Sequence, residues 1–426
     1  MHHGTEVSPG VATGIGVYFA LLCLLNVGAA WYVSSRSQKK PLVVLWGLVA
    51  FGYLFCSVMA VNGNPVLLPE GFKQAVNGVA GPVTFTFGSL GFFVVFLLLR
   101  RFFVRPVVAW TALNMLTLFF GISMTDPNFQ EIVGKPDNVP ISGMIFLLAF
   151  FTWLAMSKAV ENDRRIEQGK PVVEKDQSES VLVWPDLVYT ELICMVLVTV
   201  VLVMWSVPLR APLEQPATSL KTPNPSKAPW YFLGLQEMLV YYDPWMAGVV
   251  LPTMIIVGLV ALPYIDFNKL GNGYYTYVQR KFAINTFLFG FLVLWVTLIL
   301  MGTFLRGPNW NFFGPYEPWD VHKVEALNNV QMAEIFWVQF MHQGLPSQWY
   351  MRELPGIVLT VLYLFALPPL LGLVVMRKYL DRMGFVRFMV LATLIQFMAA
   401  LPIKMLLRWT INLKYIVYIP EFFFNI

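Results

Sequence analysis

Charged side chains are scarce in this sequence. Asp, Glu, Lys and Arg make up 12% of the 426 residues, whereas 57% are hydrophobic and the mean hydropathy is +0.64. A soluble domain has about 25% charged residues. The shortage excludes an ordinary soluble domain and predicts an integral membrane protein. The net charge of +5 says little about partners, since basic residues in such a protein first report topology. We expect the protein to lie in a lipid membrane and to bind no nucleic acid.

Cysteine is also rare. The three cysteines, Cys23, Cys56 and Cys194, all lie within apolar runs, and no Cys-x-x-Cys or Cys-x-x-Cys-His motif is present. This pattern argues against a disulfide framework, a zinc site and covalently attached haem. We therefore predict no metal site formed by this chain.

The sequence contains only four histidines: His2, His3, His322 and His342. A haem held by two histidines within a membrane needs one on each of two facing helices. None of the four lies in an apolar run long enough to span. We therefore expect this chain not to ligate haem b alone, and we interpret His322 and His342 as polar loop residues.

Long apolar runs dominate the rest of the chain. A spanning helix needs about 20 mostly apolar residues. Ten runs fit, which predicts an all-α polytopic membrane protein with about ten transmembrane helices. The first run has no basic residue before it, so we interpret it as a retained span. Residues 331–342 are apolar but too short, and we expect a surface helix there. The ten runs are 12–33, 41–61, 81–99, 106–124, 141–157, 187–207, 246–264, 283–305, 355–376 and 386–408.

Basic residues in the loops indicate the orientation. If the N-terminus lies outside, most of the 29 Lys and Arg residues fall in short inner loops, as the positive-inside rule requires. We predict a multi-pass protein of the inner (cytoplasmic) membrane with both termini on the outer side. Lys404 and Arg408 fall inside the last span, and we expect them to snorkel.

The first five spans carry almost no ionisable side chains in their centres. Pumps and ion-coupled carriers usually place such groups at membrane depth. We interpret these spans as a packing, docking or lipid-facing module. No repeat relates the two halves, so an inverted-repeat transporter is not supported.

The strongest local pattern is "NPSKAPWYFLGLQE" at 224–237. From Trp230 onward, apolar residues follow helical spacing, which predicts a short interfacial helix. Its buried positions would be Phe232, Leu235, Met238 and Leu239, with Tyr231 and Glu237 at the edge of the hydrocarbon. An aromatic belt without further function is the alternative.

Three motifs resemble the C-terminal domain of cytochrome b, and most closely subunit IV of the cytochrome bf complex. They are "VWPDLVY" at 183–189, "EQPATSLKTPNPSKAPWYF" at 214–232 and "ALPYID" at 261–266. A further stretch, "RGPNWNFFGPYEPWDVHKV" at 306–324, is similar to a loop in relatives from bacterial bc-type quinol-oxidising complexes. With this resemblance we divide the chain into a five-helix module (1–160), a cytoplasmic linker (161–181), a subunit IV-like domain (182–305), a long outer loop (306–353) and a two-helix extension (354–426).

The resemblance implies a role in electron transport. In the family, the Trp-Tyr segment lines the site where quinol is oxidised at the outer face, with protons released outside. It implies a quinol, which we expect to be of the menaquinone type, and quinone-binding residues Pro229, Trp230, Tyr231, Phe232 and Asp186. It also implies three partners: a haem b-binding cytochrome b-type subunit, a Rieske-type or other outer electron acceptor, and a cytochrome c. The alternative is a quinone-binding membrane anchor of a different respiratory oxidoreductase.

This sequence departs from the family at one position. Pro229 stands where the family has the glutamate that accepts a proton from quinol, and proline cannot take a proton. Glu237 follows eight residues later, seven after Trp230, which is almost two helical turns. We therefore expect Glu237 to be the catalytic proton acceptor. The alternatives are that Glu237 only faces the surface or pairs with Lys227. Asp186, at the inner end of a span, is a second proton-handling candidate, or a carboxylate favoured there by the helix dipole.

Overall fold

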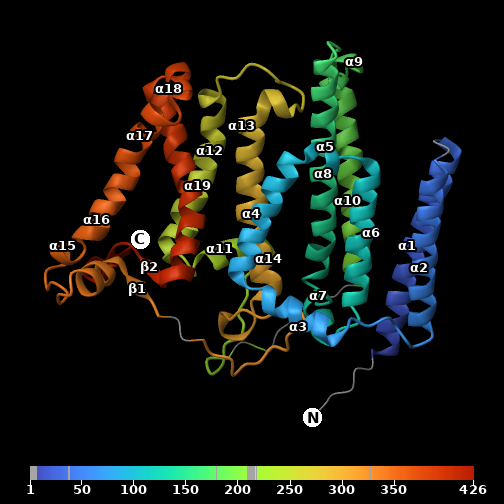
Figure 1. Ribbon diagram of the computed structural model, residues 1–426, viewed down its shortest axis with the longest axis horizontal. Helices are drawn as coiled ribbons and strands as arrows, with labels where there is room; N and C mark the ends of the chain where they lie inside the picture. Colours follow the sequence, from blue (N-terminus) through green and yellow to red (C-terminus); the bar gives the residue numbers. More distant parts are fainter. Residues whose placement is uncertain (1–6, 37–38, 179, 209–215, 217, 326–327) are drawn as a thin grey trace. The chain divides into compact units, whose positions relative to one another are not determined.

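The protein consists almost entirely of helices (Figure 1). The structure, a computed structural model, describes residues 7–36, 39–178, 180–208, 216, 218–325 and 328–426. Within these ranges nine helices are long and apolar enough to cross a membrane, or ten if one bent pair is counted. The predicted all-α polytopic membrane fold is confirmed.

The bent pair explains the third predicted span, 81–99. It consists of α3 (Glu70–Val79) and α4 (Pro82–Leu98), which meet at an angle of 84°. Proline lacks an N–H and disfavours helical geometry in the residue before it, so Pro82 begins a new helix. Proline also stands in the first turn of α2, α6 and α8, where a missing N–H costs nothing.

The other nine predicted spans each coincide with a helix or a run of helical segments. These are α1 (Pro9–Arg36), α2 (Lys40–Val61), α6 (Pro106–Ser123), α8 (Val139–Glu167), η1 with α10 (Val183–Ser206), η2 with α12 (Met246–Ile265), α13 to η4 (Tyr277–Leu305), α16 to α17 (Leu354–Val374) and α19 (Phe385–Ile411). Shorter helices are α5 (Arg100–Phe103), α7 (Pro127–Val133), α9 (Val173–Asp176), α11 (Trp230–Met238), α15 (Trp349–Arg352) and α18 (Arg377–Met383). The short helix predicted from Trp230 is α11. The predicted surface helix at 331–342 is shorter, η6 (Glu334–Phe340), and follows strand β1.

Two compact units divide the chain. The first comprises residues up to 81, 95–223 and 312–320, and the second comprises 82–94, 224–311 and 321–426. This division by packing separates α10 from the rest of the segment 182–305. The predicted domain boundaries, which describe sequence modules, remain a prediction.

In the first unit, α1 and α2 run side by side (Figure 1) and share an apolar core around Phe19 and Tyr53. A neutral polar network joins them to α6. Asn26 Nδ2 donates to Asn114 Oδ1 at 2.7 Å, and Tyr53 Oη donates to the Asn114 carbonyl at 2.8 Å. Uncharged hydrogen bonds of this kind hold helices together within a membrane.

The second unit comprises α11, α12, α16 to α19, the run from α13 to η4 and residues 82–94 of α4. Two glycines bring α11 close to its neighbour. A Cβ on Gly234 would lie 3.3 Å from Ile299, and one on Gly302 would lie 3.3 Å from the Leu233 carbonyl. Two short strand pairs complete the unit: β1 (Val330–Gln331) with β2 (Leu413–Tyr415), and β3 (Tyr418–Ile419) with β4 (Phe424–Asn425).

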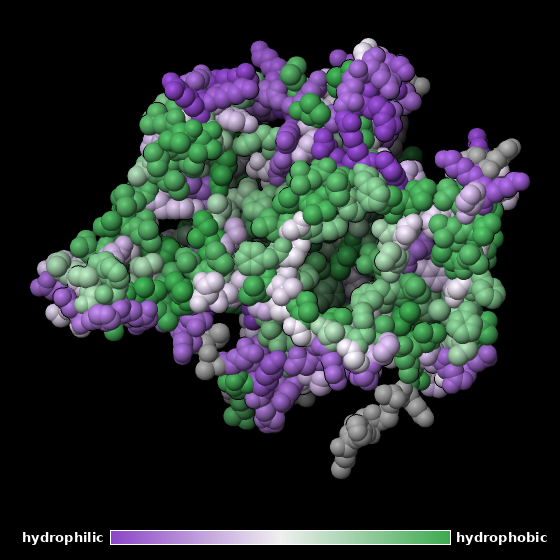
Figure 2. Space-filling model, viewed as in Figure 1, coloured by the Kyte–Doolittle hydropathy of each residue, from purple (hydrophilic) through white to green (hydrophobic). Residues whose placement is uncertain are grey.

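Side-chain exposure agrees with a lipid environment. Hydrophobic residues cover the flanks of the helices and hydrophilic residues gather at their ends (Figure 2). The α10 helix (Val188–Ser206) has no buried residue. The expectation that Lys404 and Arg408 snorkel is wrong, because they are only 2% and 5% exposed. Their partners belong to the segment 412–426 and the loop before β1.

Candidate functional site

The predicted quinone-binding segment is an extended chain that turns into α11. Pro229 occupies the position before the first helical residue and has extended backbone angles. Gln236, on the helix, fixes the incoming chain, because its amide accepts a hydrogen bond from Ala228 N and donates one to the Ser226 carbonyl, each at 2.8 Å. The sequence thus places Trp230, Tyr231 and Phe232 in the first turn of a fixed helix.

The orientation of α11 differs from the expected one. Its buried residues are Leu233, Gly234, Glu237 and Met238. Tyr231 and Phe232 are exposed by 50% and 52%, and the centroids of their rings are 4.8 Å apart. Phe232 is therefore not on the buried face, and Glu237, which we expected at the edge of the hydrocarbon, has no exposed surface. A carboxylate is buried in this way only with a partner.

That partner is Arg306, at the end of the run from α13 to η4. Its Nε donates to Glu237 Oε2 at 3.0 Å, and its Nη2 donates to Oε1 at 2.7 Å. Trp310 Nε1 donates to Oε2 at 3.2 Å, and Tyr241 Oη donates to Oε1 at 3.3 Å. A carboxylate has about four acceptor positions, so these four donors occupy all of them. The alternative pairing with Lys227 is not the one formed, and Lys227 Nζ donates to the Thr303 carbonyl.

The turn after Arg306 sets the position of Trp310. Asn309 and Trp310 have φ values of +57° and +56°, a region that bulky residues rarely adopt. The turn is held by Arg306 Nη1, which donates to the Trp310 carbonyl at 2.7 Å, and by Asn309 N, which donates to Asn224 Oδ1 at 2.7 Å. Such strained backbone persists only where its surroundings fix it, and it is common at functional sites.

Tyr241 completes the cluster. Burial raises its pKa well above the ordinary value of 10; the Glu237 carboxylate raises it further, and Arg306 opposes this. The phenol therefore stays protonated at working pH and remains a donor to Glu237. The Tyr241 ring also contacts the Trp409 ring at 5.8 Å.

Asp186 lies in the other unit. It is exposed, in η1 (Val183–Leu187), directly before α10. The structure therefore brings Pro229, Trp230, Tyr231 and Phe232 together with Glu237 in one unit, and places Asp186 outside this group.

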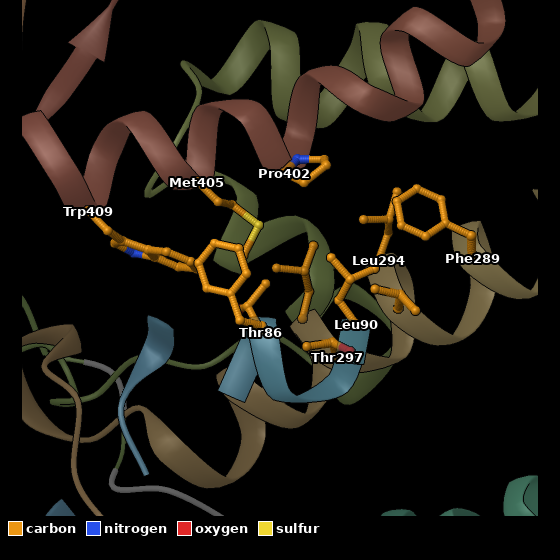
Figure 3. Close-up of a pocket in the computed structure, with 11 residues that line it drawn as sticks. Thr86, Leu90, Phe289, Leu294, Thr297, Pro402, Met405 and Trp409 are labelled. Atoms are coloured by element: carbon orange, nitrogen blue, oxygen red, sulfur yellow. The ribbon is translucent and has the colours of Figure 1, made fainter. Parts of the chain in front are cut away.

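A cavity of about 100 Å³ lies deeper in the second unit (Figure 3). Met405 and Trp409 of α19 face Thr86 and Leu90 of α4 across it, and its lining is almost entirely apolar. Apolar cavities of this size stay dry and can take small apolar groups. None of the predicted site residues lines it.

Sequence reasoning missed Arg306, Trp310 and Tyr241. The signal for the first two was present in "RGPNW" at 306–310, an arginine at the end of a span followed by turn residues and an aromatic. The partner of Arg306, Glu237, lies 69 residues away in the sequence, and no local pattern predicts that the two residues pair.

Haem ligation can be tested on the described residues. Among these, the two histidines are His322, in a turn, and His342, after η6, both outside the helices that could span a membrane. They do not fit a haem held by two histidines between facing helices. His2 and His3 lie outside the described residues.

Comparison with known protein families gives a match to part of the chain. The family model described as cytochrome b (C-terminal)/b6/petD matches residues 216–312, less than a quarter of the chain. No curated protein and no solved structure matches the chain. The matched stretch contains α11, Glu237, Arg306, Trp310 and the two spans between them, and it begins after the "VWPDLVY" stretch. Residues 216–312, called the family segment below, are therefore similar to the C-terminal domain of cytochrome b.

Proposed function

We propose that this chain is a cytochrome b-type membrane subunit of a quinol oxidoreductase, and that α11 forms one wall of its quinol-oxidation site. One observation carries the proposal. The family match covers both the aromatic first turn of α11 and the buried ion pair that fixes this helix. The inner membrane, with the α11 end of the bundle outside, is part of the proposal.

The exposed residues supply the binding surface. Tyr231 and Phe232 present adjacent rings on the face of α11 that the described part of the chain leaves half exposed. Aromatic faces suit a quinone ring, since offset stacking favours such pairs. Pro229 starts the helix and Trp230 packs beside Tyr231 at 5.7 Å. A companion subunit carrying haem b forms the opposite wall.

The reaction is the oxidation of quinol to quinone, which releases two electrons and two protons. Haem b in the companion and an outer acceptor of Rieske type, followed by a cytochrome c, would supply the electron acceptors. The quinone is of the menaquinone type. The redox chemistry belongs to the cofactors, and this chain supplies orientation and proton handling. Asp186 is proposed to handle protons at the opposite end of the spans.

Glu237 as proton acceptor remains a hypothesis, and its geometry adds a condition. All acceptor positions of the carboxylate are occupied, so a donor must leave before a proton arrives. Trp310 and Tyr241 make the two longest of the four bonds, so a change at either one frees an oxygen while Arg306 stays in place.

Purification of the complex from native membranes tests the proposal. We expect a companion subunit with a haem b spectrum, and quinol:cytochrome c reductase activity. Tyr231→Ala and Phe232→Ala should raise KM for quinol, whereas Leu220→Ala, at a residue that is 92% exposed, should not. A purified complex with quinone binding but no haem b would favour the membrane-anchor alternative. A complex with neither would refute the proposal.

A further inference from the structure

The segment 412–426, outside the family match, packs against the far end of α11. Lys414 Nζ donates to the carbonyls of Leu239 and Val240 at 2.6 and 3.0 Å. Leu239 is the C-cap residue, directly after the last residue of α11. The last carbonyls of a helix have no partner within it, and a cation is favoured at that end. Lys414 therefore caps the helix that carries the proposed quinol-binding rings.

Lys414 itself is held in place. Lys404 Nζ, from α19, donates to the Lys414 carbonyl at 2.6 Å. On either side of Lys414, Leu413 and Tyr415 pair with Val330 and Gln331 in the two-stranded sheet. Leu413 has no exposed surface. The backbone that presents the ammonium group is thus fixed by a buried lysine and by strand pairing.

The same segment contacts the connection between α11 and α12. Trp245 Nε1 donates to the Asn425 carbonyl at 2.8 Å, and the Trp245 ring contacts Phe424 at 5.4 Å. Asp243 accepts longer hydrogen bonds from Tyr415 and Asn425, each at 3.4 Å. The chain leaving α11 is therefore fixed at two places by residues from 412–426.

The two ends of α11 are held by different parts of the chain. Its incoming end and buried face contact residues within the family segment, through Lys227 to Thr303 and Glu237 to Arg306. Its outgoing end contacts Lys414, about 100 residues beyond that segment. A helix of nine residues is marginal by itself, so both attachments determine where its first turn lies.

We propose that Lys414 is a positioning residue for quinol binding: by capping α11 it fixes the helix that presents Tyr231 and Phe232. This inference rests on the proposed function. Lys414 touches no reacting group, and it acts through the position of the helix. The groups facing its ammonium are Lys404 and Arg408 from α19, Asp243 from the connection, and the Tyr415 ring.

The test compares three variants of the whole complex in membranes. Lys414→Met removes the donors, and Lys414→Gln keeps a neutral donor. Lys378→Met is the control, because it removes an exposed lysine of α18, the short helix before α19. Hydrogen–deuterium exchange is followed on the peptide 230–245, together with KM and kcat for quinol.

We expect Lys414→Met to speed exchange in 230–245 and to raise KM about tenfold, the scale of one lost hydrogen bond to a charged group, while kcat stays near the wild-type value. Lys414→Gln should recover much of both effects, and Lys378→Met should show neither. Unchanged exchange in Lys414→Met would overturn the inference, as would faster exchange with an unchanged KM. Failure of the proposed function is distinguishable, because the wild-type complex would then oxidise no quinol.

Discussion

The guanidinium of Arg306 donates to both carboxylate oxygens of Glu237, at 2.7 and 3.0 Å, although the two residues are 69 positions apart. Glu237 has no exposed surface and Arg306 is 8% exposed. A paired arrangement of this kind combines charge with fixed geometry. It joins α11 to the residue that precedes the turn at 307–311, close to the end of the family segment.

Replacement of Glu237 tests whether this residue only stabilises the protein through its ion pair with Arg306 or also accepts a proton from quinol. Glu237→Gln leaves the Arg306 charge buried without its partner, so we expect the complex to lose about 3–5 kcal/mol of stability. If Glu237 also accepts a proton, the variant complexes that still assemble should turn over about 10²–10⁴ times more slowly than the wild type. Thermal unfolding and quinol oxidation per assembled complex measure the two effects separately.

Arg306→Gln is the matched control for that experiment, because it breaks the same ion pair and keeps the carboxylate. If Glu237 accepts the proton, Arg306→Gln should destabilise the complex as Glu237→Gln does but retain most of the turnover. An equal loss of turnover in both variants would contradict the proton-accepting role and leave Glu237 as a structural anchor.

The isolated chain should bind no haem b through paired histidines. The two histidines of the described residues, His322 and His342, lie in loops outside the spanning helices. The pyridine haemochrome spectrum of the purified subunit, compared with that of the whole complex, measures this. A stoichiometric haem b with two histidine ligands in the isolated subunit would show that a companion is not needed.

The segment before α11 should face the outside of the cell. In a variant without native cysteines, Ser219→Cys should react with an impermeant thiol reagent in intact cells, because this side of the spans follows from the distribution of basic residues. Gln168→Cys, in the predicted inner loop and exposed, should react only after the cells are opened. The reverse pattern would mean that the topology is inverted.

The stability of the protein should rise with pH above about 8. Burial lowers the pKa of Lys414 to about 8 from the ordinary value of 10.5; Arg408 adds to this, and Asp243 opposes it. Between those values the unfolded chain binds more protons than the folded one, so the free energy of unfolding increases with pH. Below about pH 8 both states carry the charge and the folded state bears the full cost of burying it.

Thermal unfolding of wild type and Lys414→Met over this pH range measures that contribution. We expect Tm of the wild type to rise more steeply with pH than Tm of the variant, since methionine does not titrate. Parallel curves would show that another group, and not Lys414, governs stability in this range.

The sequence alone determined the class of protein and the positions of its helices. Apolar runs of spanning length predict the spans because lipid offers no hydrogen-bond partners. A segment that crosses the membrane must satisfy its own backbone groups, and a helix does this. The third predicted span, 81–99, corresponds to α4, but the sequence did not predict the separate helix α3 before it or the bend of 84° between the two. The motifs around Trp230 indicated the resemblance to cytochrome b, and helical spacing predicted α11, because both are local properties.

Only the tertiary structure decided which face of α11 is buried. The apolar residues of this helix suggested that the face with Phe232 is buried. The buried face instead contains Glu237, which pairs with Arg306. Two opposite charges can be buried together when their hydrogen bonds are complete. The same applies to Lys404 and Arg408. We expected these two residues of the last span to snorkel, and they instead donate to main-chain carbonyls of neighbouring segments. Such partners are distant in sequence and leave no periodic signal, so they become visible only when the chain is folded.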